Sequence, residues 1–330
     1  MKLIKTRYLI LIDCAAIGLA LVVFALFDHV IPHASEQVVV VPQTAYTAVV
    51  SETQTQEEMQ TEEAVQETPA QVGIFDFPGV FTDGEVIVTD TSYKSANVSI
   101  TLTNVTYSTP SKQCYFVEDI YIRSIDCLRC VFAKDTYGKS ISENFEKLAT
   151  RSSALAAINT DYYGWGSRTG GLVIRNGVLY RSETARDEDM LVIYRDGSMQ
   201  PILAGSTFDP QALIDAGAWQ AYSFGPSLLD ENGNKREDLE KTNHDPRTVL
   251  GMIEPGHYVF IVFDGRQDSS YAKGYTYRTA ADVCVELGCK VAFNLDGGES
   301  SQMAFMGKRI NKPYKDGRSV SDILMIGELQ

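Results

Sequence analysis

A break in composition at Gly73 limits the part of this chain that can form a folded core. Upstream of it, residues 34–72 contain seven glutamates but no lysine or arginine, with threonine, glutamine and valine between them. Such a segment cannot bury enough apolar surface to offset the conformational entropy that it would lose on folding. We therefore expect residues 34–72 to form an acidic, disordered tether and residues 73–330 to form a single globular outer domain.

Residues 1–33 predict a cytoplasmic stub followed by a transmembrane signal anchor. The stretch Tyr8–Phe27 is apolar apart from Asp13 and a few small residues, and a bilayer-spanning helix needs about 20 such residues. Three cations precede it, which predicts a cytoplasmic N-terminus and a cell-membrane protein with a single span and an extracytoplasmic C-terminal domain. A cleaved signal peptide is the alternative, although Pro32 stands where a cleavage site needs a small residue.

The overall charge argues against nucleic acid as a partner. The formal net charge is −14, and the tether contributes part of it. Acidic residues still outnumber basic ones from Gly73 onward, so the outer domain has no basic footprint. The predicted partners are a membrane, through the N-terminal helix, and a substrate.

Five cysteines fall in the outer domain: Cys114, Cys127, Cys130, Cys284 and Cys289. Disulfides persist outside the cytoplasm, so one or two bridges are conceivable there. The Cys127-Leu-Arg-Cys130 motif also permits a zinc or redox interpretation, but a single C-x-x-C without a second ligand pair is a weak signal. Buried or free thiols are the third reading, and all three stay open.

Strand patterns outnumber helix patterns in the outer domain. Strands are expected over residues 99–106, 114–122, 127–133, 154–159, 171–179, 190–194, 248–253, 257–263 and 290–295. Helices are expected from a capping box at Ser140 to Arg151, after Asp209-Pro210, and over residues 276–287 with Gly288 as the terminating residue. These expectations give an α+β fold with a mixed, largely antiparallel sheet flanked by a few helices.

Several apolar strands end in charged or polar residues. Four carboxylates (Asp161, Asp245, Asp264 and Asp296) and two arginines (Arg247 and Arg266) stand at such ends. After the last predicted strand, Asp296 is followed by Gly297-Gly298-Glu299-Ser300-Ser301. Glycine amides together with serine hydroxyls can cradle an anion. An ordinary Asp-Gly turn is the alternative for this segment.

This order of motifs resembles the phosphodiester glycosidase family from about Ile120 to the end. The matching segments are Asn159-Thr-Asp-Tyr-Tyr163, Gly170-Gly171, Phe224-Gly225, Pro246-Arg-Thr248, Asp264-Gly-Arg266, Asn294–Ser301 and Arg318-Ser-Val320. Two residues depart from the family pattern, because Thr160 and Glu299 both stand where glycine is usual. Glu299 adds a negative charge beside the expected anion cradle, so it either points away or alters which aglycone is accepted.

The resemblance implies hydrolysis of the sugar C1–O bond of a sugar phosphodiester or phosphopolysaccharide at the cell envelope. Such a reaction needs a carboxylate at the sugar, and it needs cations and amides at the phosphate. The predicted catalytic residues are Asp296, Asp264 and Asp161. The predicted substrate-binding residues are Asn159, Arg247, Arg266, Asn294, Gly297, Gly298, Ser300, Ser301 and Arg318.

Other functions compete with this prediction. No cofactor is expected, but Mg²⁺ or Ca²⁺ would suit the aspartates in a metal-dependent phosphodiesterase. A surface-anchored glycan-binding module without turnover is a further alternative. A serine hydrolase is disfavoured, because Gly298-Glu-Ser-Ser-Gln302 lacks the last glycine of G-x-S-x-G.

Overall fold

The computed structural model describes residues 39–40, 73–107, 112–164, 171–183, 187–240, 243–267 and 271–329. The chain divides into two compact units, Met1–Val39 and Val40–Gln330, and every element from β2 onward belongs to the second. Both the predicted anchor and the predicted tether lie outside the described residues, apart from the two-residue strand β1 (Val39–Val40). Within the described residues no helix combines the length and the apolar character that a membrane span requires.

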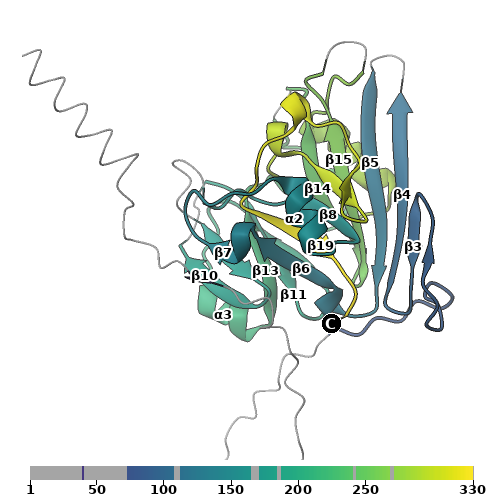
Figure 1. Ribbon diagram of the computed structural model, residues 1–330. Helices are drawn as coiled ribbons and strands as arrows, with labels where there is room; N and C mark the ends of the chain where they lie inside the picture. Colours follow the sequence, from purple (N-terminus) through teal and green to yellow (C-terminus); the bar gives the residue numbers. More distant parts are fainter. Residues whose placement is uncertain are drawn as a thin grey trace, which may run out of the picture. The chain divides into compact units, whose positions relative to one another are not determined.

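Most strands belong to three sheets in which all pairings are antiparallel (Figure 1). The seven-stranded sheet runs in the order β16 (Val291–Leu295), β14 (Arg247–Glu254), β15 (His257–Asp264), β5 (Gln113–Ile122), β4 (Val98–Tyr107), β3 (Ser92–Lys94) and β2 (Ile87–Val88). One five-stranded sheet runs β10 (Val178–Ser182), β9 (Leu172–Arg175), β13 (Ala218–Ser223), β11 (Met190–Tyr194) and β12 (Met199–Ile202). The other runs β18 (Lys308–Arg309), β17 (Met303–Phe305), β8 (Ala156–Asn159), β19 (Asp322–Ile326) and β6 (Leu128–Phe132).

The remaining elements are short. They are β7 (Thr136–Tyr137), the helices α2 (Phe145–Arg151), α3 (Pro210–Asp215) and α4 (Tyr277–Glu286), and the 3₁₀ turns η1 (Ile125–Cys127), η2 (Ala133–Asp135), η3 (Gly298–Ser300) and η4 (Tyr314–Asp316). The predicted α+β class with largely antiparallel strands and a few flanking helices is confirmed. The strands are divided among several sheets.

One apolar core joins the three large sheets. Its fully buried members include Ile100 and Phe260 from the seven-stranded sheet, Leu191 from the second sheet, and Ile158 and Leu324 from the third. Apolar residues alternate along β4 and β5, so the residues of these strands that join the core lie on one face of the seven-stranded sheet. A second cluster packs α4 against the opposite face of the seven-stranded sheet, through residues such as Cys284. Packing on both faces therefore holds the seven-stranded sheet rigidly.

Helix starts follow local capping chemistry. In α4, Thr276 and Thr279 cap each other in a reciprocal capping box, and Gly288 takes the predicted left-handed conformation (φ 83°) after the helix ends. The cap predicted at Ser140 is wrong. α2 is capped by Asn144, whose side chain accepts the Lys147 N–H at 3.0 Å. The glutamate of the predicted capping box, Glu143, instead pairs with Arg151.

The strand predicted over residues 171–179 is a hairpin. Leu172–Arg175 pairs with Val178–Ser182, and Asn176 and Gly177 make the turn with φ values of 52° and 77°. Asn-Gly is the sequence that a tight hairpin turn favours, because both positions need a positive φ. The turn signal was thus present within an otherwise apolar run.

Candidate functional site

A pocket of about 250 Å³ opens beside the strands β14 and β16. It is lined by Phe224, Asp245, Pro246, Arg247, Arg266, Tyr277, Asp296, Gly297, Gly298, Glu299 and Arg318. Three arginines and three carboxylates are therefore among the lining residues. Six of the twelve residues predicted from the sequence belong to this lining: Arg247, Arg266, Asp296, Gly297, Gly298 and Arg318.

Strand register explains why these distant segments meet. β14 is antiparallel to both of its neighbours, with Arg247 opposite Phe263 of β15 and Thr248 opposite Leu295 of β16. The start of β14 therefore lies beside the ends of β15 and β16. Residues that precede β14 and residues that follow β15 and β16 must project from the same edge of the sheet. This edge carries the pocket.

Asp296 is the carboxylate at the centre of this group. Its side chain is 11% exposed, and the Arg318 guanidinium donates to it at 2.8 Å. Arg318 also donates through Nε to the Ser300 hydroxyl at 2.6 Å and lies 4.6 Å from the ring centroid of Tyr162. Burial raises the pKa of Asp296 above the ordinary aspartate value, against hydrogen bonding from Ser300 and the positive charge of Arg318. The carboxylate is thus desolvated yet held in one orientation.

Two of the lining arginines share one carboxylate. Asp245 accepts from Arg266 at 2.9 Å and from Arg247 at 3.3 Å. The Arg247 side chain is 3% exposed and lies over the ring of Tyr277 at 4.1 Å, whereas the Arg266 side chain is 44% exposed. Two guanidinium groups beside one carboxylate leave an excess positive charge facing the pocket. Such an excess suits an anionic ligand group.

The glycine turn does not form the open anion cradle that the sequence predicted. The Gly298 N–H is already used, because it donates to the Pro246 carbonyl at 3.1 Å. The Gly297 N–H interacts with the Asp296 carboxylate. Glycine is nevertheless required here, because a Cβ on Gly297 would lie 2.8 Å from the Pro246 oxygen and Gly298 has a φ of 66°. The turn positions Asp296 and brings the backbone close to the residues before β14.

Asp264 does not line the pocket, so the predicted partnership with Asp296 needs correction. Its carboxylate accepts from Asn311 at 2.8 Å, from the Tyr271 hydroxyl at 2.8 Å and from the Lys312 N–H at 3.0 Å. Burial raises its pKa, while the Asn311 and Lys312 hydrogen bonds oppose this rise. With its oxygens held by protein donors, Asp264 fixes the segment after β18 to the end of β15.

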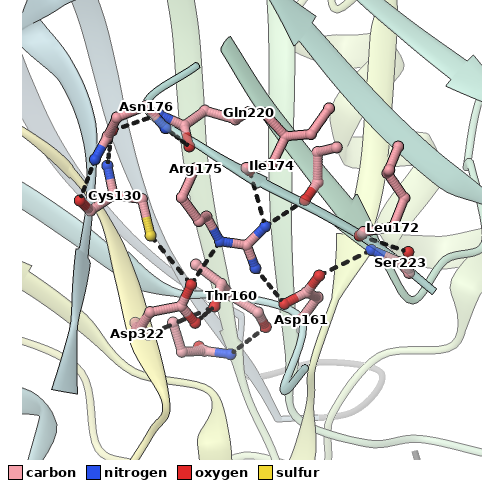
Figure 2. Close-up of polar contacts among 12 residues, drawn as sticks. Cys130, Thr160, Asp161, Leu172, Ile174, Arg175, Asn176, Gln220, Ser223 and Asp322 are labelled. Atoms are coloured by element: carbon pink, nitrogen blue, oxygen red, sulfur yellow. Dashed lines mark hydrogen bonds and ion pairs between the residues drawn. The ribbon is translucent and has the colours of Figure 1, made fainter. Parts of the chain in front are cut away.

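Asp161 also lies away from the pocket, inside a buried ionic network (Figure 2). The Arg175 guanidinium donates to Asp161 at 2.7 Å and to Asp322 at 2.7 Å, and all three side chains are at most 1% exposed. The Ser223 N–H donates to the second Asp161 oxygen at 2.9 Å. Burial raises the pKa of Asp161 to about 6, although the positive charge of Arg175 opposes it. This network joins β9 and β19 to the segment after β8, and it places the predicted catalytic residue Asp161 outside the pocket lining.

Three further predicted residues support the pocket from behind. Asn159 donates to the Asp296 carbonyl at 2.8 Å and accepts from the Thr248 hydroxyl at 2.7 Å. Asn294 donates to the Gly225 carbonyl at 2.8 Å. Ser301 is fully buried, and its carbonyl accepts from Asn311. None of the three belongs to the pocket lining, and the two asparagines tie the pocket strands to neighbouring segments. Asn159 also lines a small neighbouring cavity together with Asp296 and Ser300.

Sequence reasoning missed part of the lining. The sequence indicates Asp245 only as a strand-end carboxylate, although its position two residues before Arg247 is a usable signal. Tyr277 stands at the start of a predicted helix, and no local pattern indicates that its ring supports an arginine. Glu299 lines the pocket and pairs with Lys315 at 3.0 Å. Ser300 is not part of this lining, but it contacts both Asp296 and Arg318 and lines a small neighbouring cavity with Asp296.

The cysteines and aspartates provide no metal site within the described ranges. No three His, Cys, Asp or Glu side chains there are grouped closely enough to hold a metal ion. The five outer cysteines are free and buried. Cys130 donates to Asp322 at 3.1 Å and thereby joins the network around Arg175 (Figure 2).

The chain can now be compared with known proteins. The profile of the phosphodiester glycosidase family matches residues 152–327, which is just over half of the chain. Over 263 residues the chain is 29% identical to the uncharacterized SPbeta prophage-derived protein YomE of Bacillus subtilis (strain 168). That match covers 75% of this chain but 39% of YomE, so the chain spans about two fifths of this relative.

Two solved structures have a similar fold. One is the zebrafish N-acetylglucosamine-1-phosphodiester alpha-N-acetylglucosaminidase catalytic domain, auto-inhibited by its pro-peptide, with a TM-score of 0.54 and 17% identity over 70% of this chain and 83% of that chain. The other is a hypothetical protein from Synechocystis, with a TM-score of 0.51 and 13% identity over 70% of this chain and 62% of that chain. At these low sequence identities, the similarity shows that the fold is shared and nothing more.

Proposed function

Because the chain belongs to the phosphodiester glycosidase family, we propose that it hydrolyses the C1–O bond of a sugar phosphodiester and releases free sugar and a phosphomonoester. One observation carries this proposal. A buried carboxylate, Asp296, faces the same pocket as the paired cations Arg247 and Arg266. A sugar carbon and a phosphate group can therefore be held at once.

The chemistry of the bond suits a site of this kind. When C1–O breaks, its electron pair leaves with the phosphate oxygen, and water supplies the oxygen that ends on C1. A phosphate monoester is a good leaving group, so little general-acid assistance is needed. The remaining requirement is a carboxylate that attacks C1 or takes a proton from the attacking water.

We assign this reacting carboxylate to Asp296. Arg318, Ser300 and the Gly297 N–H fix its orientation, and its burial leaves it poorly solvated and therefore more reactive as a base or nucleophile. Asp264 and Asp161 have no part in the chemical step, because their oxygens are held by protein donors outside the pocket lining.

Phosphate binding is assigned to the two arginines around Asp245. Arg266 is the more exposed of the two and lines the pocket, while Arg247 is fixed by the Tyr275 carbonyl at 3.1 Å and by the ring of Tyr277. These cations would absorb the negative charge that grows on the phosphate as the C1–O bond breaks.

The products and the destination of water oxygen test the reaction. The purified protein is incubated with sugar–phosphate–alkyl diesters in ¹⁸O-labelled water, with and without a chelator. Free sugar that carries ¹⁸O, together with unlabelled alkyl phosphate, is the expected result. Label in the phosphate would show P–O cleavage instead, and loss of turnover with the chelator would favour a metal-dependent phosphodiesterase. Binding of the diester without turnover would favour a glycan-binding module.

We further propose that the domain acts outside the cytoplasm, anchored through residues 8–27. The support is the sequence pattern of an apolar run preceded by cations. A substrate in the cell envelope, such as a phosphopolysaccharide, would then be within reach. Protease added to intact cells should remove a C-terminal tag from the full chain, whereas a tag that is cut only after lysis would contradict this location.

A further inference from the structure

Glu299 is the pocket-lining carboxylate for which the proposed reaction has no use. It belongs to the turn η3, directly after the two glycines, and its side chain is 32% exposed. Its carboxylate pairs at 3.0 Å with Lys315, which belongs to η4 and is 65% exposed. The Glu299 carbonyl also accepts the Arg318 N–H at 3.1 Å. The Glu299 backbone is therefore held by Arg318, and its carboxylate is held at the pocket by Lys315.

The net charge around the pocket follows from its ion pairs. Arg247 and Arg266 share Asp245, Arg318 pairs with Asp296, and Lys315 pairs with Glu299. Two of these groups are neutral overall, and the group around Asp245 has one positive charge in excess. With a neutral residue in place of Glu299, the same groups would have two positive charges in excess.

We propose that Glu299 makes this pocket select singly charged phosphodiesters over doubly charged phosphomonoesters. A diester has one negative charge, which matches the single positive excess. A phosphomonoester is close to doubly charged above its second pKa of about 6. The second charge meets no unmatched cation and is repelled by the Glu299 carboxylate. This inference rests on the proposed function, because the phosphomonoester is then the reaction's own product and Glu299 assists its release.

The expected size of the effect follows from the exposure of the pair. A partly exposed carboxylate acts on a ligand charge through a medium of high effective dielectric, and Lys315 screens it further. We expect a change of about threefold to tenfold in the preference for one ligand charge over the other. High salt should reduce this change, because the pocket is open to solvent.

Binding of two matched probes tests the proposal without any need for turnover. Phenyl phosphate is doubly charged at pH 7.5, and methyl phenyl phosphate has nearly the same shape but a single charge. Neither contains a glycosidic bond, so a failure of the proposed hydrolysis would not affect this measurement. Dissociation constants for both are measured by NMR titration with the full chain and with Glu299→Gln.

Glu299→Gln should bind phenyl phosphate about threefold to tenfold more tightly, with a smaller change for methyl phenyl phosphate. Lys315→Gln should shift the ratio of the two constants in the opposite direction. Glu85→Gln is the control, because it removes the same charge just before β2, the edge strand at the other end of the sheet from β16. It should change neither dissociation constant. Equal tightening of both probes by Glu299→Gln, or no tightening of either, would overturn the proposal.

A kinetic readout separates selectivity from a structural role. If turnover occurs, Glu299→Gln and Glu299→Gly should both increase inhibition by the phosphomonoester product, while KM for the diester changes less. A variant that merely disturbs the turn would raise KM for the diester and weaken both probes. That outcome would also contradict the assignment.

Discussion

At the scale of single residues, Asp296 differs from the other predicted carboxylates in what surrounds it. Asp161 and Asp264 are each held by protein donors away from the pocket, whereas Asp296 faces the pocket from a charge pair with Arg318. A carboxylate can react only where a substrate atom can reach it. Position in the tertiary structure therefore distinguishes three aspartates that look alike in the sequence.

Asp296→Asn should abolish turnover with little effect on folding. The amide keeps the shape of the side chain but can neither attack C1 nor accept a proton, so we expect kcat to fall by at least about a thousandfold. The check is sugar release together with the urea unfolding midpoint. Asp282→Asn, on the exposed surface of α4, is the matched control and should retain full activity.

The activity of the protein should fall with decreasing pH at a value above the ordinary aspartate pKa of 3.8. Burial raises the pKa of Asp296, and the proposed mechanism needs its ionised form, so activity is lost as pH falls through this raised pKa. Arg318→Gln removes a stabilising positive charge, and the acid limb of kcat/KM should move to still higher pH. Arg123→Gln, near Asp76, should leave the limb unchanged. If the acid limb of kcat/KM does not move in Arg318→Gln, the group whose titration limits activity is not Asp296.

At the scale of elements, the turn after β16 depends on glycine for two separate reasons. Gly298 has a φ of 66°, and a Cβ there would lie 3.1 Å from Nη1 of Arg266. Gly205 has a φ of 81° but open space around its Cβ position. The two glycines therefore share the conformational requirement but differ in what a side chain would displace.

Gly298→Ala and Gly205→Ala should each lower the free energy of unfolding by about 1–2 kcal/mol, because alanine is strained at these φ values. Only Gly298→Ala should also raise KM, because its methyl group pushes Arg266 away from Asp245. Urea unfolding and steady-state kinetics measure the two effects. A rise in KM for both variants would point to a general loss of stability as its cause.

At the scale of the whole molecule, the network around Arg175 joins two of the three large sheets. Arg175 comes from β9 of one sheet and Asp322 from β19 of another, and both side chains are fully buried (Figure 2). One guanidinium serves two carboxylates, so the network has an excess negative charge whenever both are ionised. Burial, with the negative charge of Asp322 added to it, is why the pKa of Asp161 is raised although Arg175 lies beside it.

Arg175→Met should destabilise the protein strongly at neutral pH. It leaves two buried carboxylates unpaired, which costs about 3–5 kcal/mol. The folded-state pKa of Asp161, already about 6 against 3.8 for the free group, should rise further, so the defect is largest above pH 6 and shrinks as the carboxylates take up protons at lower pH. Urea unfolding at pH 7.5 and pH 5 checks this. Arg309→Met breaks an exposed pair with Asp316 and should cost less than about 1 kcal/mol at either pH.

Residues close in the chain were enough to predict the local structure and the family. Alternating residues predicted β4 and β5, and an apolar stripe with a terminating Gly288 predicted α4, because strand faces and helix ends depend on residues close in the chain. The ordered motifs from Asn159 to Arg318 predicted the phosphodiester glycosidase family. The cap at Asn144 and the hairpin at Asn176-Gly177 also have local signals, which stronger neighbouring patterns obscured.

Which strand-end residues share a pocket depends on how distant strands pair and pack. Antiparallel register brings the start of β14 beside the ends of β15 and β16, so Arg247, Arg266 and Asp296 face one space while Asp161 and Asp264 are enclosed by protein. Whether a carboxylate is reactive or structural depends on its burial and on donors from distant segments. No local pattern contains that information, because the donors are fixed by packing between sheets.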